Sequence, residues 1–207
     1  YGMSGYDPYT QGTEVAVDAN FNDTIADANL LGGGVYQVYL QAVCGVDTSQ
    51  YIGPFLITIP LSNDTVCGAE MLAADGTLYT FNNTGATVQA NESSIAPPAT
   101  GAQTNDGWIN STLNSTTWFT FIAPSSGNVR VNNTAINYAG QAAVYESLGC
   151  SDFGLFTLVA ANDNAIVGTS NAPNFTACGL TPGDTVYLMI DGNTATTGNY
   201  SISITPI

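Results

Sequence analysis

The feature that most constrains this fold is a series of short segments in which apolar and polar residues alternate. Alternation with a period of two is typical of strands that bury one face. Turn residues (Gly, Asn, Asp and Pro) bound these segments, and no segment keeps a helical period. The clearest are residues 13–18, 35–43, 55–59, 78–81, 117–122, 128–132, 141–145, 155–159, 185–190 and 200–204. Their spacing predicts an all-β chain of antiparallel β-sandwiches.

Two modules are predicted, with a boundary near residue 60. Residues 35–43 and 55–59 are expected to pair as a hairpin, and a Pro-containing segment, 60–67, separates them from a new pattern. The predicted modules are therefore 1–60 and 61–207. The polar residues 90–116 are expected to form a long surface loop. Because 60 residues are few for an independent sandwich, we expect strands from outside this segment to complete the first module, in cis or in trans.

Charge and composition exclude several classes of function. The chain has 16 Asp and Glu, no His, and Arg130 as its only Lys or Arg, giving a net charge of −15. One cation cannot neutralise a nucleic acid or an anionic membrane, so both are excluded as partners. Without His or Lys there is no Ser-His-Asp machinery, imidazole ligand or Schiff base. These absences predict a protein that is not an enzyme.

No membrane insertion is expected either. The longest apolar stretch, residues 54–61, is far too short to cross a bilayer, and the first residues do not have the pattern of a signal peptide.

Four cysteines indicate the compartment. Cys44, Cys67, Cys150 and Cys178 form no CxxC pair, which argues against zinc, and an even number suits an extracellular protein with disulfides. We expect Cys150–Cys178, because both lie at strand–loop edges of one module. The hairpin separates Cys44 from Cys67 by ~20 Å or more, beyond the ~7 Å limit between Cα atoms. Cys44 is therefore expected to pair with a cysteine before Tyr1 or to remain free.

The densest group of oxygen ligands is Asn162, Asp163 and Asn164, with Asp191 as a further candidate. Carboxylate and amide oxygens are the ligands that Ca²⁺ prefers, so a structural calcium ion is one interpretation. A solvated Asn/Asp turn is the other. Asp106 and Asp152 are two further carboxylates that the fold could bring near this group. No other cofactor is expected, and nothing in the sequence brings two acids together as a catalytic pair.

Two kinds of residue are candidates for contact with glycans. Trp108, in the polar segment 105–110, is either a sugar-binding ligand residue or a cap on the sandwich, whereas Trp118 belongs to an apolar strand and to the core. Asn-x-Ser/Thr occurs nine times, at Asn22, Asn63, Asn82, Asn91, Asn110, Asn114, Asn132, Asn174 and Asn199. These triplets indicate either N-glycosylation or the composition of β-turns.

The first part resembles the later two-thirds of a fibronectin type III module of secreted Bacteroidota proteins. The likeness rests on residues 1–6, on Leu30 six places before Tyr36, and on residues 35–45 and 47–55. The resemblance implies that Tyr36 holds a tyrosine corner and that the early strands of the module are absent.

The second part resembles a jelly-roll-like module akin to bacterial pre-peptidase C-terminal domains. The matching segments are residues 63–67, 118–127, 143–145, 150–153, 159–163 and 178–191. Family members often carry Phe-Asp-Thr where this chain has residues 137–141 without a carboxylate, so a family calcium site that uses that Asp is not expected here.

These resemblances imply export, by the type IX route, and placement on a cell surface. They also point to Asp-Thr-aliphatic motifs as O-glycan acceptors, at Thr24, Thr65 and Thr185.

Two functions remain in view. The first is a non-enzymatic extracellular structural or adhesive protein, part of a cell-surface adhesin or filament, whose partners are copies of itself or neighbouring modules. The second is a carbohydrate-binding or targeting module of a larger secreted hydrolase.

Overall fold

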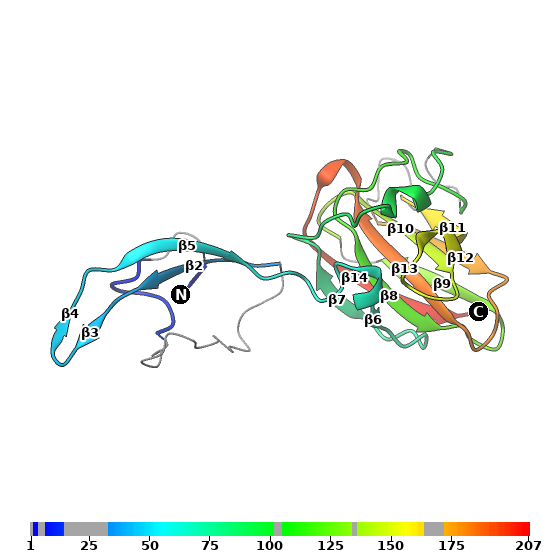
Figure 1. Cartoon of the computed structure of the whole chain (residues 1–207). Coiled ribbons are helices and arrows are strands. Elements are labelled where there is room, and N and C mark those ends of the chain that lie inside the picture. Colours follow the sequence, from blue (N-terminus) through cyan, green and yellow to red (C-terminus); the bar gives the residue numbers. More distant parts are fainter. Residues whose placement is uncertain (1, 4–6, 15–32, 102–104, 134–135, 164–171) are drawn as a thin grey trace. The chain divides into compact units, whose positions relative to one another are not determined.

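The computed structural model describes residues 2–3, 7–14, 33–101, 105–133, 136–163 and 172–207 (Figure 1). The chain divides into two compact units, Tyr1–Leu61 and Ser62–Ile207, and the sequence placed this boundary after residue 60. Strands dominate both units, so the prediction of an all-β antiparallel chain is confirmed. The helices of the described residues are single 3₁₀ turns, and none has the length and apolar character needed to cross a membrane.

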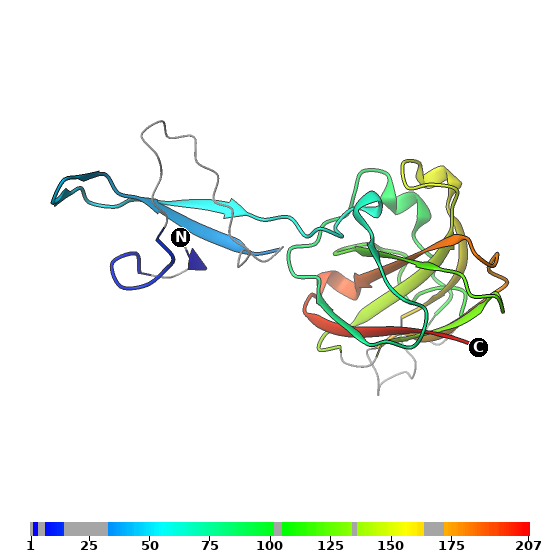
Figure 2. The same cartoon turned by 90° about the horizontal axis from the view of Figure 1, so that it is seen from below.

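Unit 1 is built on the predicted hairpin. Its strands are β1 (Gly2–Met3), β2 (Val35–Leu40), β3 (Val43–Cys44), β4 (Asp47–Thr48) and β5 (Ile52–Thr58). The sheet has the order β1-β2-β5, and Val38 lies opposite Phe55. Strands β3 and β4 pair with each other beyond a bulge, at the tip of the hairpin (Figure 2).

The described strands of unit 1 leave apolar side chains exposed on both faces. Leu56 is 67% exposed and Ile57 is 43% exposed. Because successive side chains of a strand point to opposite faces, both faces of β5 have exposed apolar side chains among the described residues. Of the described apolar residues in unit 1, Tyr36 alone is buried.

Unit 2 is a β-sandwich of a five-stranded and a four-stranded sheet. The sheet orders are β11-β10-β13-β8-β6 and β12-β9-β14-β7, and every described pairing is antiparallel except that of β6 with β8. The strands are β6 (Glu70–Met71), β7 (Tyr79–Asn82), β8 (Thr117–Ile122), β9 (Asn128–Asn133), β10 (Gly140–Glu146), β11 (Thr157–Asn162), β12 (Asn174–Cys178), β13 (Thr185–Gly192) and β14 (Asn199–Pro206). The short helices are η1 (Val66–Gly68), η2 (Glu92–Ile95), η3 (Phe153–Leu155) and η4 (Asn193–Ala195).

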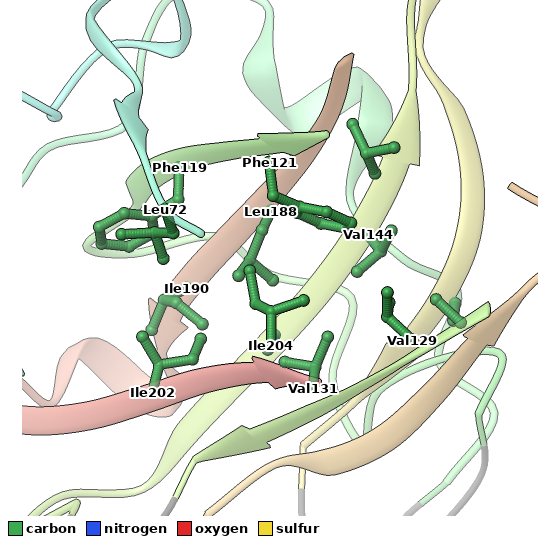
Figure 3. Packing of buried hydrophobic residues seen from close by; sticks show 14 of the residues in the cluster. Leu72, Phe119, Phe121, Val129, Val131, Val144, Leu188, Ile190, Ile202 and Ile204 are labelled. Atoms are coloured by element: carbon green, nitrogen blue, oxygen red, sulfur yellow. The ribbon is translucent and has the colours of Figure 1, made fainter. Parts of the chain in front are cut away.

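The main core lies between the two sheets. Phe119, Phe121 and Leu188 of the five-stranded sheet face Val131 and Ile204 of the other sheet (Figure 3). All five are fully buried, as expected for the inward half of each alternating strand.

The outward half of the five-stranded sheet is also apolar and carries a second core. Trp118, Tyr145 and Met189 point to this side and are covered by Val66 and Trp108 from the loops. Residues 90–116, expected as a surface loop, belong to a longer segment that covers the sheet, and we call the described residues of that segment, 83–101 and 105–116, the covering loop. The expectation was wrong in this respect because β8 and β13 are apolar on both faces and need cover on both.

The outward face of the four-stranded sheet is polar, and no loop among the described residues forms an apolar core over it. Asn82 Nδ2 donates to Asn199 Oδ1 at 2.7 Å, and Thr80 and Ser201 share a hydrogen bond of 2.9 Å. In β12 and β14 the sequons at Asn174 and Asn199 place Asn and Thr or Ser two residues apart, on the same face. The alternation of the strands thus accounts for two of the nine sequons.

We expect Leu188→Ala to lower the free energy of unfolding of unit 2 by about 3 kcal/mol, because it leaves a cavity in the main core. Leu148, which is 94% exposed, provides the control, and Leu148→Ala should change this free energy by less than about 0.5 kcal/mol. Urea titration followed by tryptophan fluorescence measures unit 2 specifically, because both tryptophans belong to it. Equal effects of the two substitutions would contradict the assignment of the core.

Candidate functional site

The covering loop and its attachment points hold most of the residues singled out by the sequence. A disulfide between Cys67 and Cys150 fixes one side of this region, with a Cα–Cα distance of 5.0 Å. Cys67 lies in η1, where Thr65 Oγ1 accepts a hydrogen bond from Gly68 N. The disulfide joins residues 83 positions apart in the sequence. It ties the segment before β6 to the loop that follows β10.

The predicted disulfide Cys150–Cys178 is wrong. Cys178 ends β12 opposite Asn128, in the four-stranded sheet, and its side chain is exposed. Cys150 packs beside the second core, over the other sheet. The two residues belong to one module but to different layers of it. Cys44 is also a free, exposed thiol, and the prediction that it does not pair with Cys67 is confirmed.

The assignment of Trp108 as a ligand-binding residue is also wrong. Its side chain has no exposed surface, and its Nε1 donates to the backbone oxygen of Ala142 at 3.0 Å. Trp108 N donates to Pro98 O, which closes the loop on itself. Trp108 therefore caps the sheet, the other interpretation that the sequence had left open, while Trp118 is buried in the core as predicted.

A buried glutamate holds the middle of the covering loop. Glu92 Oε2 accepts from Gln89 N at 2.6 Å and Glu92 Oε1 accepts from Trp118 Nε1 at 3.0 Å. Removal from water raises the pKa of Glu92, and these hydrogen bonds oppose that rise in part. No sequence pattern predicts this role, because an Asn-Glu-Ser-Ser segment is typical of an exposed turn.

Two aspartates hold the end of the same loop. Asp191 Oδ1 accepts from Ser115 N at 2.6 Å, and Asp191 Oδ2 accepts from Gln141 Nε2 at 2.7 Å. Asp163 Oδ2 accepts from Ile109 N. Burial raises the pKa of Asp191, and its N–H donors partly offset this. Both carboxylates thus provide acceptors for backbone N–H groups of the loop.

The expected calcium ligands do not come together as an oxygen cage in the described residues. Ala142 of β10 pairs with Asn162 on one side and with Ile190 on the other, so β11, which Asp163 follows, and β13, which contains Asp191, are two strand spacings apart. That separation is about 9–10 Å between backbones. Asn164 lies outside the described residues.

The other two carboxylates do not complete such a cage. Asp106 lies in a bridge with Ala161, and Asp152 Oδ1 accepts from Gly154 N at 2.8 Å as the cap of η3. No group of three His, Cys, Asp or Glu side chains in the described ranges is close enough to hold a metal. Among the described candidates, Asp163 and Asp191 bind the backbone of the covering loop. The expected binding of Ca²⁺ stays a prediction.

The glycosylation candidates occupy different environments. Thr65 and Thr185 are exposed, at the start of η1 and of β13 respectively, and Thr24 lies outside the described residues. Asn91 is exposed in a left-handed conformation with φ of 69°, whereas Asn63 is buried. Exposure therefore favours Thr65, Thr185 and Asn91 as acceptors over Asn63.

A polar groove lies beside the disulfide. Gln89, Asn91, Ser94, Ser151 and Asp152 line it. Asp152 is its only carboxylate and caps η3. The groove thus lacks a pair of groups that could serve as general acid and base.

Comparisons with known proteins add little. No protein-family model matches the chain, and no curated protein matches it. Among solved structures it is similar to the pre-peptidase C-terminal domain of a collagenase from Bacillus anthracis, with 13% sequence identity and a TM-score of 0.36. The match covers 66% of this chain and 93% of that domain. An identity and a TM-score this low carry no inference about function.

We expect removal of the disulfide, by Cys67→Ser with Cys150→Ser, to lower the free energy of unfolding of unit 2 by about 2–5 kcal/mol. The reason is that the bond closes a long loop in the unfolded chain. Urea titration measures the change, and Cys178→Ser is the control that removes a cysteine outside the bond. Peptide mapping without reductant should recover Cys67 joined to Cys150, and recovery of Cys150 joined to Cys178 would contradict the structure.

The buried carboxylates predict how stability depends on pH. A carboxyl group whose pKa is higher in the folded than in the unfolded state favours folding when protonated, so its contribution is full at low pH. That contribution is lost as the pH rises through the raised pKa. For Glu92 the ordinary pKa is 4.5, and we expect the free energy of unfolding to fall as the pH rises above that value and through the raised pKa.

Glu92→Gln should make this fall smaller, since the substituted side chain does not titrate. Asp184→Asn removes one exposed charge from the same unit and is the matched control. Urea titrations at several pH values give the slope of the free energy of unfolding against pH for each variant. A slope unchanged by Glu92→Gln but reduced by Asp184→Asn would assign the dependence to surface charge.

Proposed function

We propose that the chain is a non-enzymatic extracellular structural or adhesive protein, part of a cell-surface adhesin or filament. The observation that carries the proposal is the hairpin of β2 and β5, whose apolar side chains are exposed on both faces. Ile52 is 64% exposed and Leu56 is 67% exposed. Exposed apolar strands are typical of surfaces that associate with other chains.

The energetics favour association through these strands. Burying one Leu or Ile side chain is worth about 1.5–3 kcal/mol. Neither β2 nor β5 contains a charged residue, so contact through them avoids the repulsion between chains of charge −15. Strands added from a second copy or from a neighbouring module would cover the apolar side chains.

The chemistry of the described residues supports a role without catalysis. Glu92, Asp163 and Asp191 are buried and already accept hydrogen bonds from the covering loop or its neighbours. The chain has no His and no Lys to act as a base or nucleophile. Its buried acids therefore serve the fold.

An extracellular location agrees with the disulfide, because such bonds persist in oxidising compartments. Export by the type IX route and an origin in Bacteroidota are proposed from the sequence motifs alone. Thr65 and Thr185 are exposed and are the O-glycan acceptors that belong to this proposal.

We expect the chain to assemble reversibly as its concentration rises, and Leu56→Lys to weaken that assembly by about tenfold or more in dissociation constant, because it places a charge in the apolar contact. Leu148→Lys is the control, since Leu148 is even more exposed than Leu56, at 94%, but lies in a loop of unit 2. Sedimentation of protein with its two free thiols alkylated measures non-covalent contacts only. A chain that stays monomeric at all concentrations would overturn the proposed assembly.

A second function, carbohydrate binding, is favoured by a different group of residues. Tyr9 is 63% exposed, its ring lies edge-on to Tyr51 at 4.9 Å, and its hydroxyl donates to Gln50 Oε1 at 2.9 Å. Tyr39 packs against Tyr51 in turn. Exposed aromatic rings beside amides are suited to stacking on sugars and to binding their hydroxyl groups.

Under this second function a glycan array should show saturable binding that Tyr9→Ala reduces by about tenfold. Tyr79→Ala, which removes a tyrosine from unit 2 and leaves the cluster of unit 1 intact, is the control. Binding that is unaffected by Tyr9→Ala would exclude the tyrosine cluster as the sugar site.

A further inference from the structure

The two exposed free cysteines lie on different units, and strand pairing defines the neighbours of each. Cys44 is in β3 directly opposite Asp47 of β4. Side chains of directly opposite residues share a face, with Cβ atoms about 5 Å apart. The thiol at the hairpin tip therefore has a carboxylate beside it.

The other thiol has the opposite charge nearby. Cys178 pairs with Asn128, and Thr176 pairs with Arg130, so Cys178 and Arg130 are diagonal neighbours on the outward face of β9 and β12. Diagonal neighbours are about 7–8 Å apart, within reach of a long side chain. Arg130 is exposed and is the only Lys or Arg of the chain. Cys178 is thus the only cysteine that has a basic side chain beside it.

We propose that Cys44 of one copy forms a disulfide with Cys178 of the next copy, guided by contact between Asp47 and Arg130. The charges select this pairing over the two alternatives. Joining Cys44 to Cys44 brings two Asp47 carboxylates together, and joining Cys178 to Cys178 brings two guanidinium groups together. Only the mixed pairing places opposite charges side by side.

The tip of the hairpin is shaped for such a contact. Val46, at the turn, is 99% exposed, and Val43 is 66% exposed. Gly45, between Cys44 and Val46, has a φ of 64°, which lets the chain reverse in a tight turn. Two apolar side chains, a thiol and one carboxylate are therefore presented together at the end of a narrow ribbon.

Each thiol lies at the end of its unit remote from the junction between the units. In unit 1 the turn after Cys44 is at the opposite end of the hairpin from Thr58, which pairs with Val35. In unit 2 Asn63 O accepts from Trp118 N at one end of the sandwich, whereas Cys178 lies at the other end, next to the strand start at Asn128. A contact between two different surfaces repeats from copy to copy and generates a filament unless it closes into a ring.

The bond forms by thiol–disulfide exchange with a small disulfide such as oxidised glutathione. One protein thiolate attacks the small disulfide and releases one small thiol. The second protein thiolate then attacks the mixed disulfide, releases the second small thiol, and leaves the bond between the two copies. Two protein thiols are oxidised and one small disulfide is reduced. This inference rests on the proposed extracellular structural role and specifies its partner as a second copy.

The test mixes two variants under oxidised glutathione and analyses them on gels without reductant. Cys178→Ser keeps only the thiol at Cys44, and Cys44→Ser keeps only the thiol at Cys178. We expect the mixture to give covalent dimers, each variant alone to remain mainly monomeric, and the unsubstituted chain to give a ladder. Dimers of either variant alone, in the same yield as in the mixture, would overturn the proposal. A monomeric unsubstituted chain would also overturn it, whether its two thiols are still free or are joined within one copy.

The charge contact has its own test. Asp47→Arg in the first variant, or Arg130→Glu in the second, should slow dimer formation by roughly threefold to tenfold, and combining the two should restore the rate. Glu14→Arg, a charge reversal elsewhere in unit 1, is the control for net charge. If Glu14→Arg slowed dimer formation equally, and combining Asp47→Arg with Arg130→Glu did not restore the rate, the guiding role of Asp47 and Arg130 would be contradicted. Sedimentation of alkylated protein tests the non-covalent assembly separately. A failure to form the disulfide can therefore be told apart from a failure of the proposed function.

Discussion

Burial of the five-stranded sheet on both faces is the constraint on which the rest of unit 2 depends. Strands β8 and β13 direct Phe119 and Leu188 toward the main core and Trp118 and Met189 to the opposite side. A second sheet covers the first side, and the covering loop covers the other. A loop in that position must satisfy its buried N–H groups. Trp108, through its hydrogen bond to Ala142 O, and Glu92, through its hydrogen bond from Trp118 Nε1, help to hold it against the sheet.

The chain has almost no basic side chains, and this determines which groups can stabilise the buried carboxylates that bind the covering loop. A buried carboxylate is ordinarily stabilised by a basic side chain, yet the chain has Arg130 alone, and Arg130 is exposed. Glu92, Asp163 and Asp191 instead accept N–H donors from the backbone, from Gln141 and from Trp118. These acids are charged acceptors in a region of low polarity, which is why burial raises the pKa of Glu92 and Asp191. Asp163 and Asp191, which the sequence offered as candidate calcium ligands, accept hydrogen bonds from the backbone of the covering loop.

The two units differ in how completely they bury their apolar side chains. Unit 2 covers both faces of one sheet, whereas unit 1 leaves the strands of its hairpin exposed, and Cys44 lies at the tip of that hairpin. This difference links the proposed structural role to the proposed disulfide. In these two proposals the apolar strands supply non-covalent association, and the thiols with opposite charges beside them supply a directional covalent bond.

The sequence alone predicted most of the longer strands and the hairpin of unit 1, because alternation with a period of two is a local property, whereas the strand predicted at 13–18 lies mostly outside the described residues. It missed β12, since Asn174–Cys178 directs only Phe175 and Ala177 inward and is too short to stand out. Only the tertiary structure decided that Cys150 pairs with Cys67, that Trp108 is buried, and that Glu92 is an internal acceptor. Each of these depends on which layer a distant segment packs against, and the period of a strand shows that one face is buried without showing what covers it.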